Sequence, residues 1–234
     1  MGAAAPERAV KEVARGDVRT TARRWLGPLT VITTALFVVD TLMVASQGLL
    51  FFDLPVALFV QRVPWGPFVY AMDATNVVAG YWEVLAGALI VLAMVLVDRR
   101  AGWLMAIGSI ASVFDNVLKL LFERHRPTAD LVQVLTPASG YSYPSGHAVF
   151  YTWLGFMLAF AVVPKLAPRL RPLVWAAAGL LIFTACTGRI WAGDHWPSDV
   201  LGGFLFALAW SAFVLWLPER WLPNPNRRWV GIRG

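Results

Sequence analysis

The sequence predicts an all-α polytopic membrane protein with six transmembrane helices and short interfacial helices on the outer side. Of its 234 residues, 58% are hydrophobic and only 15% are charged, whereas a soluble globular domain carries about 25% charged residues. The apolar residues form runs of roughly 20, the length at which a helix crosses a hydrocarbon core about 30 Å thick. Short polar or basic connections separate these runs, which indicates a single membrane domain.

Residues 1–25 are polar and basic and come before the first apolar run. We expect them to form a cytoplasmic arm near anionic lipid. The following run, residues 26–51, is too long for the hydrophobic region of a signal peptide and is the first predicted span. It contains Asp40, which should face the bundle because a carboxylate in lipid is costly. A polar contact with another span explains Asp40 better than a functional role does.

Residues 52–78 are apolar, but prolines and a glycine interrupt them. This spacing predicts short amphipathic helices at the outer interface rather than another crossing. The remaining spans are expected at 79–97, 101–122, 147–164, 172–189 and 198–217. The six-span membrane domain would thus cover 26–217, followed by a cytoplasmic tail, 218–234, whose tryptophans and arginines suit an interfacial anchor.

Six spans place both termini on one side of the membrane. The positive-inside rule assigns that side to the cytoplasm, because the connections and the tail on this side carry the basic residues Arg99, Arg100, Lys165, Arg169, Arg171, Arg220, Arg227, Arg228 and Arg233. We expect a multi-pass protein of the cell (plasma) membrane. These cations act as topology signals rather than as one nucleic-acid-binding face, so no nucleic-acid partner is expected.

Three short polar clusters lie at the outer ends of spans three to six, facing the outside or the periplasm. Their sequences are KLLFERHRP at 119–127, PSGH at 144–147 and GRIWAGDHWPSD at 188–199. Together they supply three cations, two imidazoles, a hydroxyl and a carboxylate: Lys119, Arg126, Ser145, His147, Arg189, His195 and Asp199. This set suits an oxyanion with several charges, and phosphate is the commonest biological one.

In the first cluster, Lys119 and Arg126 are seven residues apart. They would share one side of a helix if the third span continued to Pro127, which would then end it. Taken alone, the two side chains are also explained as cations that extend towards the interface.

In the second cluster, Ser145 is a predicted N-cap, and Gly146 lets the backbone approach a ligand closely. A helix N-terminus of this kind binds anions. His147 lies beside that position, where it could transfer a proton. An ordinary helix cap with an incidental histidine explains the string PSGH equally well.

In the third cluster, Arg189 ends the fifth span, and His195 and Asp199 are four residues apart. On a continuous helix this pair would share a face, although Pro197 in the first turn leaves the geometry open. A carboxylate bonded to one imidazole nitrogen fixes the tautomer and frees the other nitrogen as a nucleophile. A purely structural His–Asp pair is the alternative.

The three strings in order, K-x6-RP, PSGH and R-x5-H-x3-D, resemble the tripartite signature of the type-2 phosphatidic acid phosphatase superfamily, which includes membrane lipid phosphate phosphatases. The stretch that contains the clusters, 119–199, covers about a third of the chain, and the family's six-span architecture is similar to the expected topology. One departure is Gly188, where the family usually has serine. It puts the local support of the third motif in doubt more than the activity.

The resemblance implies a role for each matched residue. His195 would attack phosphorus to form a phosphohistidine, oriented by Asp199, and His147 would protonate the leaving group and then activate water. The phosphoryl oxygens would be held by Lys119, Arg126, Ser145, the Gly146 backbone N–H and Arg189. No metal and no other cofactor is needed, because these cations take the role of a metal pair. His125 lies outside the signature, and we expect it at the rim of the site.

The expected function is hydrolysis of a lipid phosphate or diphosphate at the outer face, with polyprenyl (undecaprenyl) diphosphate as the preferred substrate. The lipid tails would enter laterally, past walls formed by 52–78 and 128–143, and membrane lipids are the other expected partners. A phosphotransferase that passes the phosphoryl group to an alcohol is one alternative, and a catalytically silent membrane scaffold is another. The intact residues His147, His195 and Asp199 argue against the silent scaffold.

Overall fold

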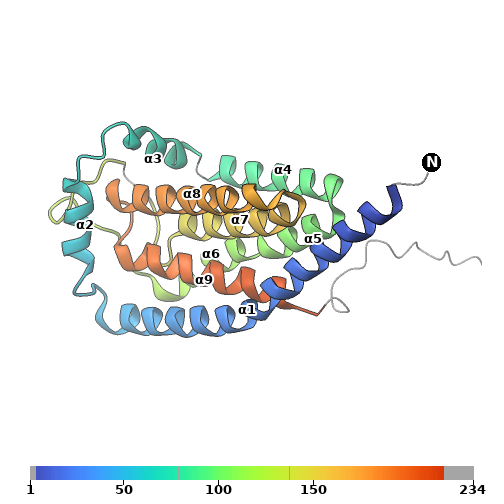
Figure 1. The fold of residues 1–234 in the computed structure, drawn as a ribbon. Helices are drawn as coiled ribbons and strands as arrows, with labels where there is room; N and C mark the ends of the chain where they lie inside the picture. Colours follow the sequence, from blue (N-terminus) through green and yellow to red (C-terminus); the bar gives the residue numbers. More distant parts are fainter. Residues whose placement is uncertain (1–3, 79, 137, 219–234) are drawn as a thin grey trace, which may run out of the picture.

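The computed structural model describes residues 4–218 apart from 79 and 137, and these residues form helices and connections without a β-strand. The predicted tail from 219 to 234 lies outside this range. Figure 1 shows a bundle of long helices with a shorter helix across one end. The helices are α1 (Ala4–Gln47), α2 (Asp53–Arg62), α3 (Phe68–Val77), α4 (Tyr81–Val97), α5 (Arg99–Gly108), α6 (Ala111–Phe122), α7 (Gly146–Val162), α8 (Arg171–Trp191) and α9 (Pro197–Trp216). Two short 3-10 helices connect α7 to α8.

The predicted all-α membrane architecture is confirmed. Five helical segments are long and apolar enough to cross a bilayer: Arg23–Gln47, Arg99–Phe122, Gly146–Lys165, Pro168–Trp191 and Pro197–Trp216. A sixth is obtained if α3 and α4, which meet at 89°, count as one bent span. The predicted span 101–122 corresponds to α5 and α6 together, and 52–78 contains the short helices α2 and α3 as expected.

Helix α1 differs from the predicted first span at both ends. It continues through the predicted boundary at residue 25 and ends at Gln47, four residues before the predicted end at 51. The next residue, Gly48, has a φ of 70°. Glycine adopts this left-handed conformation without a Cβ penalty, so it ends the helix. Asp40 faces the bundle as predicted, because its carboxylate accepts a hydrogen bond from the Tyr143 hydroxyl at 3.0 Å.

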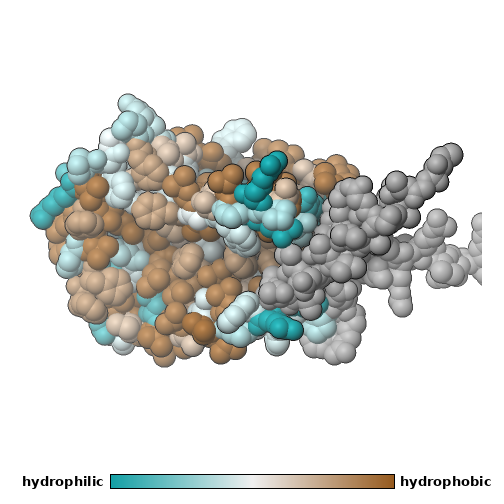
Figure 2. Space-filling view, in the orientation of Figure 1, coloured by the Kyte–Doolittle hydropathy of each residue, from teal (hydrophilic) through white to brown (hydrophobic). Residues whose placement is uncertain are grey.

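The centre of the bundle is formed by α7 and α9. In each of these two candidate spans, 61% of the most apolar stretch is buried. In the other three long candidate spans, the buried share is 17–33%. Trp153 and Met157 of α7 pack with Ala207 and Val214 of α9 in the main hydrophobic cluster. The outer helices instead expose large apolar side chains, among them Val39, Leu92 and Leu180. Figure 2 shows that the surface of the bundle is mainly apolar, with hydrophilic residues towards the ends. This surface suits contact with lipid.

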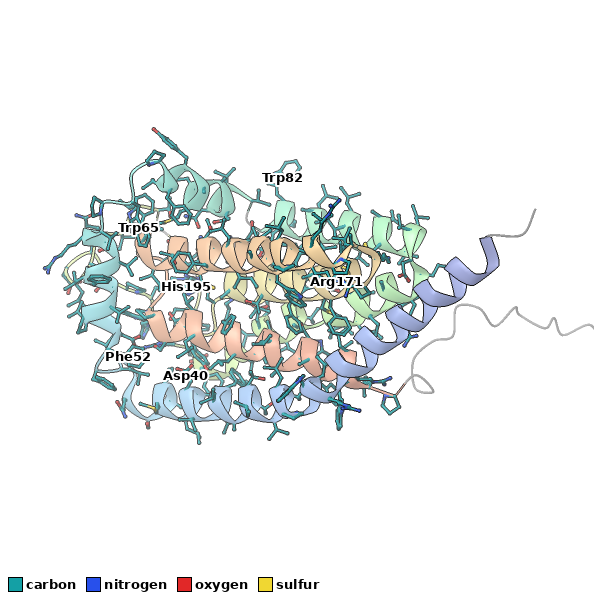
Figure 3. All side chains as sticks on the ribbon, in the orientation of Figure 1. Asp40, Phe52, Trp65, Trp82, Arg171 and His195 are labelled. Carbon is teal, nitrogen blue, oxygen red and sulfur yellow. The ribbon has the colours of Figure 1, made fainter. Side chains whose placement is uncertain are left out.

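The two ends of the bundle carry different chemistry. Because α8 begins at Arg171 and ends just before His195, the basic connections and the third polar cluster lie at opposite ends, as Figure 3 shows for these two residues. At the basic end Lys165 forms an ion pair of 2.9 Å with Asp98. The other end, beside α2, holds the C-terminus of α6 and the N-termini of α7 and α9.

Two consecutive glycines let α9 approach its neighbours closely. A Cβ at Gly202 would lie 2.8 Å from the Asp40 carboxylate of α1. A Cβ at Gly203 would lie 2.6 Å from the Ser145 carbonyl oxygen and 3.0 Å from the Ala148 Cβ. These separations are shorter than van der Waals contact. The lack of side chains at Gly202 and Gly203 therefore lets α9 pack directly against the PSGH turn and α1.

The Gly203→Ala variant is therefore expected to lower the stability of the bundle by about 1–3 kcal/mol, the usual cost of overpacking. Thermal unfolding in detergent would measure the loss. Gly179→Ala on α8 is the matched control, because Gly179 has nothing within 4 Å of its added Cβ. That control should be neutral or stabilising by about 0.5–1 kcal/mol. Equal midpoints for the two variants would contradict the close approach of α9 to Ser145.

Candidate active site

His195 and Asp199 form the predicted pair, but not on one continuous helix. His195 lies before α9, whose N-cap is Trp196 and whose first residue is Pro197. The two side chains lie next to each other at the start of α9, with His195 Nδ1 3.5 Å from Asp199 Oδ2. The Trp196 backbone N–H donates to the same oxygen at 2.8 Å. Both members of the pair are buried, His195 to 3% exposure and Asp199 completely.

The predicted helical pairing of Lys119 with Arg126 is wrong. Helix α6 ends at Phe122 because Glu123 has a φ of 46°, four residues before Pro127. Arg126 lies in the irregular segment that follows, and its guanidinium donates to the carbonyl oxygens of Gly140, Tyr141 and Asp194 at 2.7–3.2 Å. Loop carbonyls thus hold Arg126 in the site instead of a helix.

Arg126 also defines the state of the His195 ring. Its Nη1 lies 3.2 Å from His195 Nε2. A guanidinium can only donate, so Nε2 accepts and the neutral ring carries its proton on Nδ1, facing Asp199. Burial first, and then the charges of Arg189 and Arg126, hold the pKa of His195 well below its usual range. The imidazole is therefore neutral at physiological pH, the form required of a nucleophile.

The PSGH turn starts α7 as predicted. Ser145 occupies the N-cap position, but its side chain makes no capping bond. Gly146 leaves room for the Lys119–Asp115 pair, because a Cβ there would lie 3.0 Å from Lys119 Nζ and 2.7 Å from Asp115 Oδ2 and would displace the ends of both side chains. His147 is buried, with Nδ1 3.9 Å from Glu83 Oε2 of α4. The turn therefore brings a hydroxyl, an open backbone and an imidazole next to the end of α6.

Lys119 and Arg189 both have carboxylate partners. Lys119 forms an ion pair of 2.6 Å with Asp115, one turn earlier on α6. Arg189, in the last turn of α8, pairs with Asp194 at 2.9 Å and donates to the Asn76 side chain at 3.0 Å. These partners hold the two cations in the site.

The departure at Gly188 has a local explanation. A Cβ at this position would lie 3.2 Å from the Met72 Cβ and 3.4 Å from the Met72 carbonyl oxygen. A residue without a side chain therefore allows α3 to lie directly on α8, beside Arg189.

Several polar atoms of this cluster have no hydrogen-bond partner within the described residues. They are Ser145 Oγ, His147 Nε2, Arg189 Nε, His195 Nδ1 and Glu83 Oε1, and each is buried. Buried polar atoms are almost always bonded, so free ones in a cationic cluster indicate a missing ligand. Lys119, Arg126 and Arg189 are all close enough for their charges to act on His147. The structure thus brings every predicted site residue to one end of the bundle, and the free donors suit an anion.

Sequence reasoning missed a buried network behind Asp199. Arg124 donates to Asp199 Oδ1 at 2.5 Å and to Asp53 Oδ2 at 2.6 Å. Asp53 also accepts hydrogen bonds from the Ser198 backbone N–H at 2.9 Å and hydroxyl at 2.7 Å. In the sequence, this network is indicated only by Asp53 at the start of an apolar stretch and by Arg124, a second arginine within the first cluster. Asp115, Asp194 and Glu83 were missed too.

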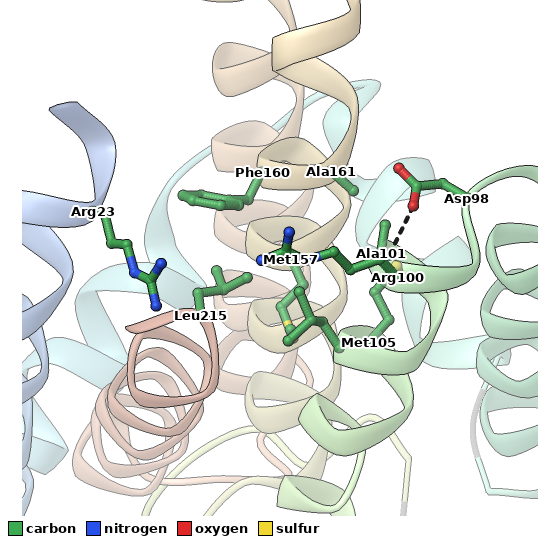
Figure 4. A pocket seen from close by; sticks show the side chains of 10 residues that line it. Arg23, Asp98, Arg100, Ala101, Met105, Met157, Phe160, Ala161 and Leu215 are labelled. Atoms are coloured by element: carbon green, nitrogen blue, oxygen red, sulfur yellow. Dashed lines mark hydrogen bonds between the residues drawn. The ribbon is translucent and has the colours of Figure 1, made fainter. Parts of the chain in front are cut away.

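Openings border the site on the side of the 123–145 segment. A cavity of about 440 Å³ lies beside Arg126, lined by Leu49, Phe122, His125 and Trp196 among others. Another, of about 570 Å³, lies between α2 and residues 129–135. A smaller cavity of about 90 Å³ at the basic end of the bundle involves no residue of the three clusters (Figure 4). Within the described residues, no three His, Cys, Asp or Glu side chains lie close enough together to hold a metal ion.

Comparison with known proteins gives consistent matches. A family model described as the PAP2 superfamily matches residues 99–223, which include all three clusters but not Asp53 or Glu83. The chain is 32% identical over 146 residues to the undecaprenyl-diphosphatase BcrC of Bacillus subtilis (strain 168), covering 58% of this chain and 70% of that protein. It is also 32% identical over 99 residues to phosphatidylglycerophosphatase B of the same organism. That match covers 41% of this chain and 47% of the relative, about half its length.

Two solved structures have the same fold. One is the crystal structure of the first transmembrane PAP2 type phosphatidylglycerolphosphate phosphatase from Bacillus subtilis, with a TM-score of 0.66 and 23% identity, covering 79% of this chain and 93% of that one. The other is the crystal structure of Aquifex aeolicus LpxE, with a TM-score of 0.59 and 18% identity, covering 71% and 96%. At these identities the similarity establishes the architecture.

Proposed function

Because the chain belongs to the PAP2 superfamily, we propose that it is an integral membrane phosphatase that hydrolyses a lipid phosphate or diphosphate at the outer face. The observation that carries the proposal is the meeting of a neutral, carboxylate-oriented His195 with three cations and free buried donors at one end of the bundle. The relatives named as undecaprenyl-diphosphatase and phosphatidylglycerophosphatase support this class of substrate.

In the proposed first step, His195 Nε2 forms a bond to phosphorus while the bond from phosphorus to the leaving oxygen breaks. Asp199 stabilises the positive charge that develops on the ring through Nδ1–H. Lys119, Arg126 and Arg189, with the Ser145 hydroxyl and the Gly146 N–H, offset the charge on the phosphoryl oxygens.

In the proposed second step, water attacks the phosphohistidine and inorganic phosphate leaves. His147 gives its proton to the leaving oxygen in the first step and takes a proton from water in the second. A protonated His147 thus acts as the acid in the first step and, once neutral, as the base in the second, so the enzyme returns to its starting protonation state.

We prefer a polyprenyl diphosphate as the substrate, since the match to the undecaprenyl-diphosphatase covers more than half of the chain. The cavity beside Arg126 suits entry of the lipid, as its wall combines apolar side chains with His125 and Arg126. The test is phosphate release by purified protein from undecaprenyl diphosphate, phosphatidylglycerol phosphate and phosphatidic acid, with the His195→Ala variant as the blank. Transfer to an added alcohol in preference to release would instead identify a phosphotransferase. Release equal to the blank on every substrate would refute the phosphatase.

Phosphate release is expected to be unaffected by EDTA. Lys119, Arg126 and Arg189 supply the positive charge that a metal pair gives in other phosphatases. The measurement is the rate before and after chelation, followed by addition of magnesium. Loss of activity with EDTA and its recovery with magnesium would contradict the proposed mechanism.

A reporter fused after Gly234 is expected to report a cytoplasmic location. The reason is that the basic connections lie at the end of the bundle opposite His195, and basic segments stay inside. A matched reporter inserted in the 128–143 segment should report the outside. The reverse pair of signals would place the proposed site on the cytoplasmic face.

A further inference from the structure

Arg124 is the centre of a buried charge network that lies behind the His195–Asp199 pair. One guanidinium nitrogen, Nη1, donates to Asp199 Oδ1 at 2.5 Å and to the Ser198 hydroxyl at 2.7 Å. The other, Nη2, donates to Asp53 Oδ2 at 2.6 Å. The Arg124 side chain is 6% exposed and both carboxylates are fully buried. Burial of three ionised groups is tolerated only with such complete pairing.

The network fixes the orientation of the Asp199 carboxylate. Its Oδ1 is held by Arg124, and its Oδ2 by the Trp196 backbone N–H at 2.8 Å. With one oxygen held by Arg124 and the other by the start of α9, Oδ2 is kept 3.5 Å from His195 Nδ1, which has no hydrogen-bond partner within the described residues. Rotation of the carboxylate away from the imidazole would break both bonds.

Asp53 holds Arg124 in turn. Besides the ion pair, its carboxylate accepts from the Ser198 N–H and hydroxyl, and from the Leu50 N–H at 3.0 Å. Asp53 is the first residue of α2, so this short helix is tied directly to the start of α9. The interfacial helix thereby belongs to the support of the active site.

The charges of the network match the needs of a phosphohistidine. Two carboxylates and one guanidinium carry a net charge of minus one, and His195 gains a charge of plus one when Nε2 bonds to phosphorus while Nδ1 keeps its proton. The network and the ring are then neutral together. The two terminal nitrogens of Arg124 are both engaged, one by Asp199 and Ser198 and the other by Asp53.

We propose that Arg124 and Asp53 are positioning residues for the reaction, and that they act through Asp199 to hold His195 in its attacking geometry. The inference rests on the proposed function. It adds a residue outside the stretch that matches the PAP2 family model, since Asp53 precedes residue 99. Arg126, by contrast, contacts the nucleophile itself.

The test uses three variants of the full-length protein and measures kcat, KM and thermal unfolding. Arg124→Lys keeps the net charge of the network but removes the fork, because one ammonium group cannot bridge two carboxylates in the same way. Arg124→Gln leaves two buried carboxylates without their cation. The double variant Asp53→Asn/Arg124→Gln restores the net charge of minus one, again without the fork. Asp40→Asn is the matched control for loss of a buried carboxylate in the same bundle.

We expect Arg124→Lys to lower kcat by about 10- to 100-fold, the usual effect of removing a supporting contact behind a reactive group, with KM near the wild-type value and an unfolding midpoint between those of the wild type and Arg124→Gln. Arg124→Gln should lose both kcat and thermal stability. The double variant should recover the midpoint but not kcat. The Asp40→Asn control should show no comparable loss of kcat.

Several results would overturn the proposal. Wild-type kcat in Arg124→Lys would show that the fork does not position Asp199. Recovery of kcat together with the midpoint in the double variant would reduce the network to a structural role. If the double variant does not fold, Arg124→Lys alone decides. A wild-type protein inactive on every lipid phosphate would refute the proposed function, whereas active wild type with equally active variants would refute only this inference.

Discussion

The His195→Ala variant is expected to lose phosphate release by about 10⁴- to 10⁶-fold, the range found when a catalytic nucleophile is removed. No other imidazole can replace it, because His147 lies on α7 beside Glu83 and His125 is exposed in the connecting segment. The measurement is single-turnover phosphate release in detergent. Quenching with SDS at alkaline pH, where a phosphohistidine is stable, should trap labelled phosphoenzyme in the wild type and none in the variant.

Thermal unfolding provides the control for this variant. Removal of a neutral ring leaves the Asp199 bonds to Arg124 and Trp196 in place, so the fold should remain. A folded His195→Ala protein that still forms a labelled phosphoenzyme would assign the nucleophile to another residue.

Replacing His147 by Gln is expected to have the second largest effect, a loss of about 10²- to 10⁴-fold on lipid substrates, as for other general acids and bases. The loss should depend on the leaving group. An aryl phosphate leaves without a proton, so its first step should remain fast in the variant, while hydrolysis of the phosphohistidine still lacks its base. A rapid burst of released phenol, followed by slow turnover, is therefore expected.

The burst distinguishes chemistry from structural damage. The wild type should show turnover without a burst, since both of its steps are assisted. An equal loss on lipid and aryl substrates, with no burst in the variant, would contradict the role of His147. The unfolding midpoint serves as the control for folding.

The sequence predicted the membrane class, the short helices within 52–78 and the family, and the PAP2 family match confirms the last of these. It did so because apolar run length, prolines and ordered short motifs are local signals. The shared helix face for Lys119 and Arg126 was wrong for an equally local reason. Glu123 adopts a left-handed conformation that no rule for that residue type predicts.

The network around Arg124 could not be found from local signals. Asp53 and Arg124 are 71 residues apart, and their contact exists only because α2 returns across the end of the bundle. Glu83 and Asp115 likewise acquire significance only from the packing of α4 and α6 next to His147 and Gly146. The motif residues could be predicted because the chemistry requires particular residue types at those positions. The supporting residues could not, because their contacts depend on the tertiary fold.

Two of the three cations proposed to hold phosphate already have a carboxylate of their own. Lys119 pairs with Asp115 at 2.6 Å, and Arg189 pairs with Asp194 at 2.9 Å. Phosphate that binds there shares these cations with fixed negative charges, which weakens its attraction to the site. Inorganic phosphate, the product without a lipid anchor, should therefore dissociate readily. The ion pairs that organise the site would thus protect the enzyme from product inhibition.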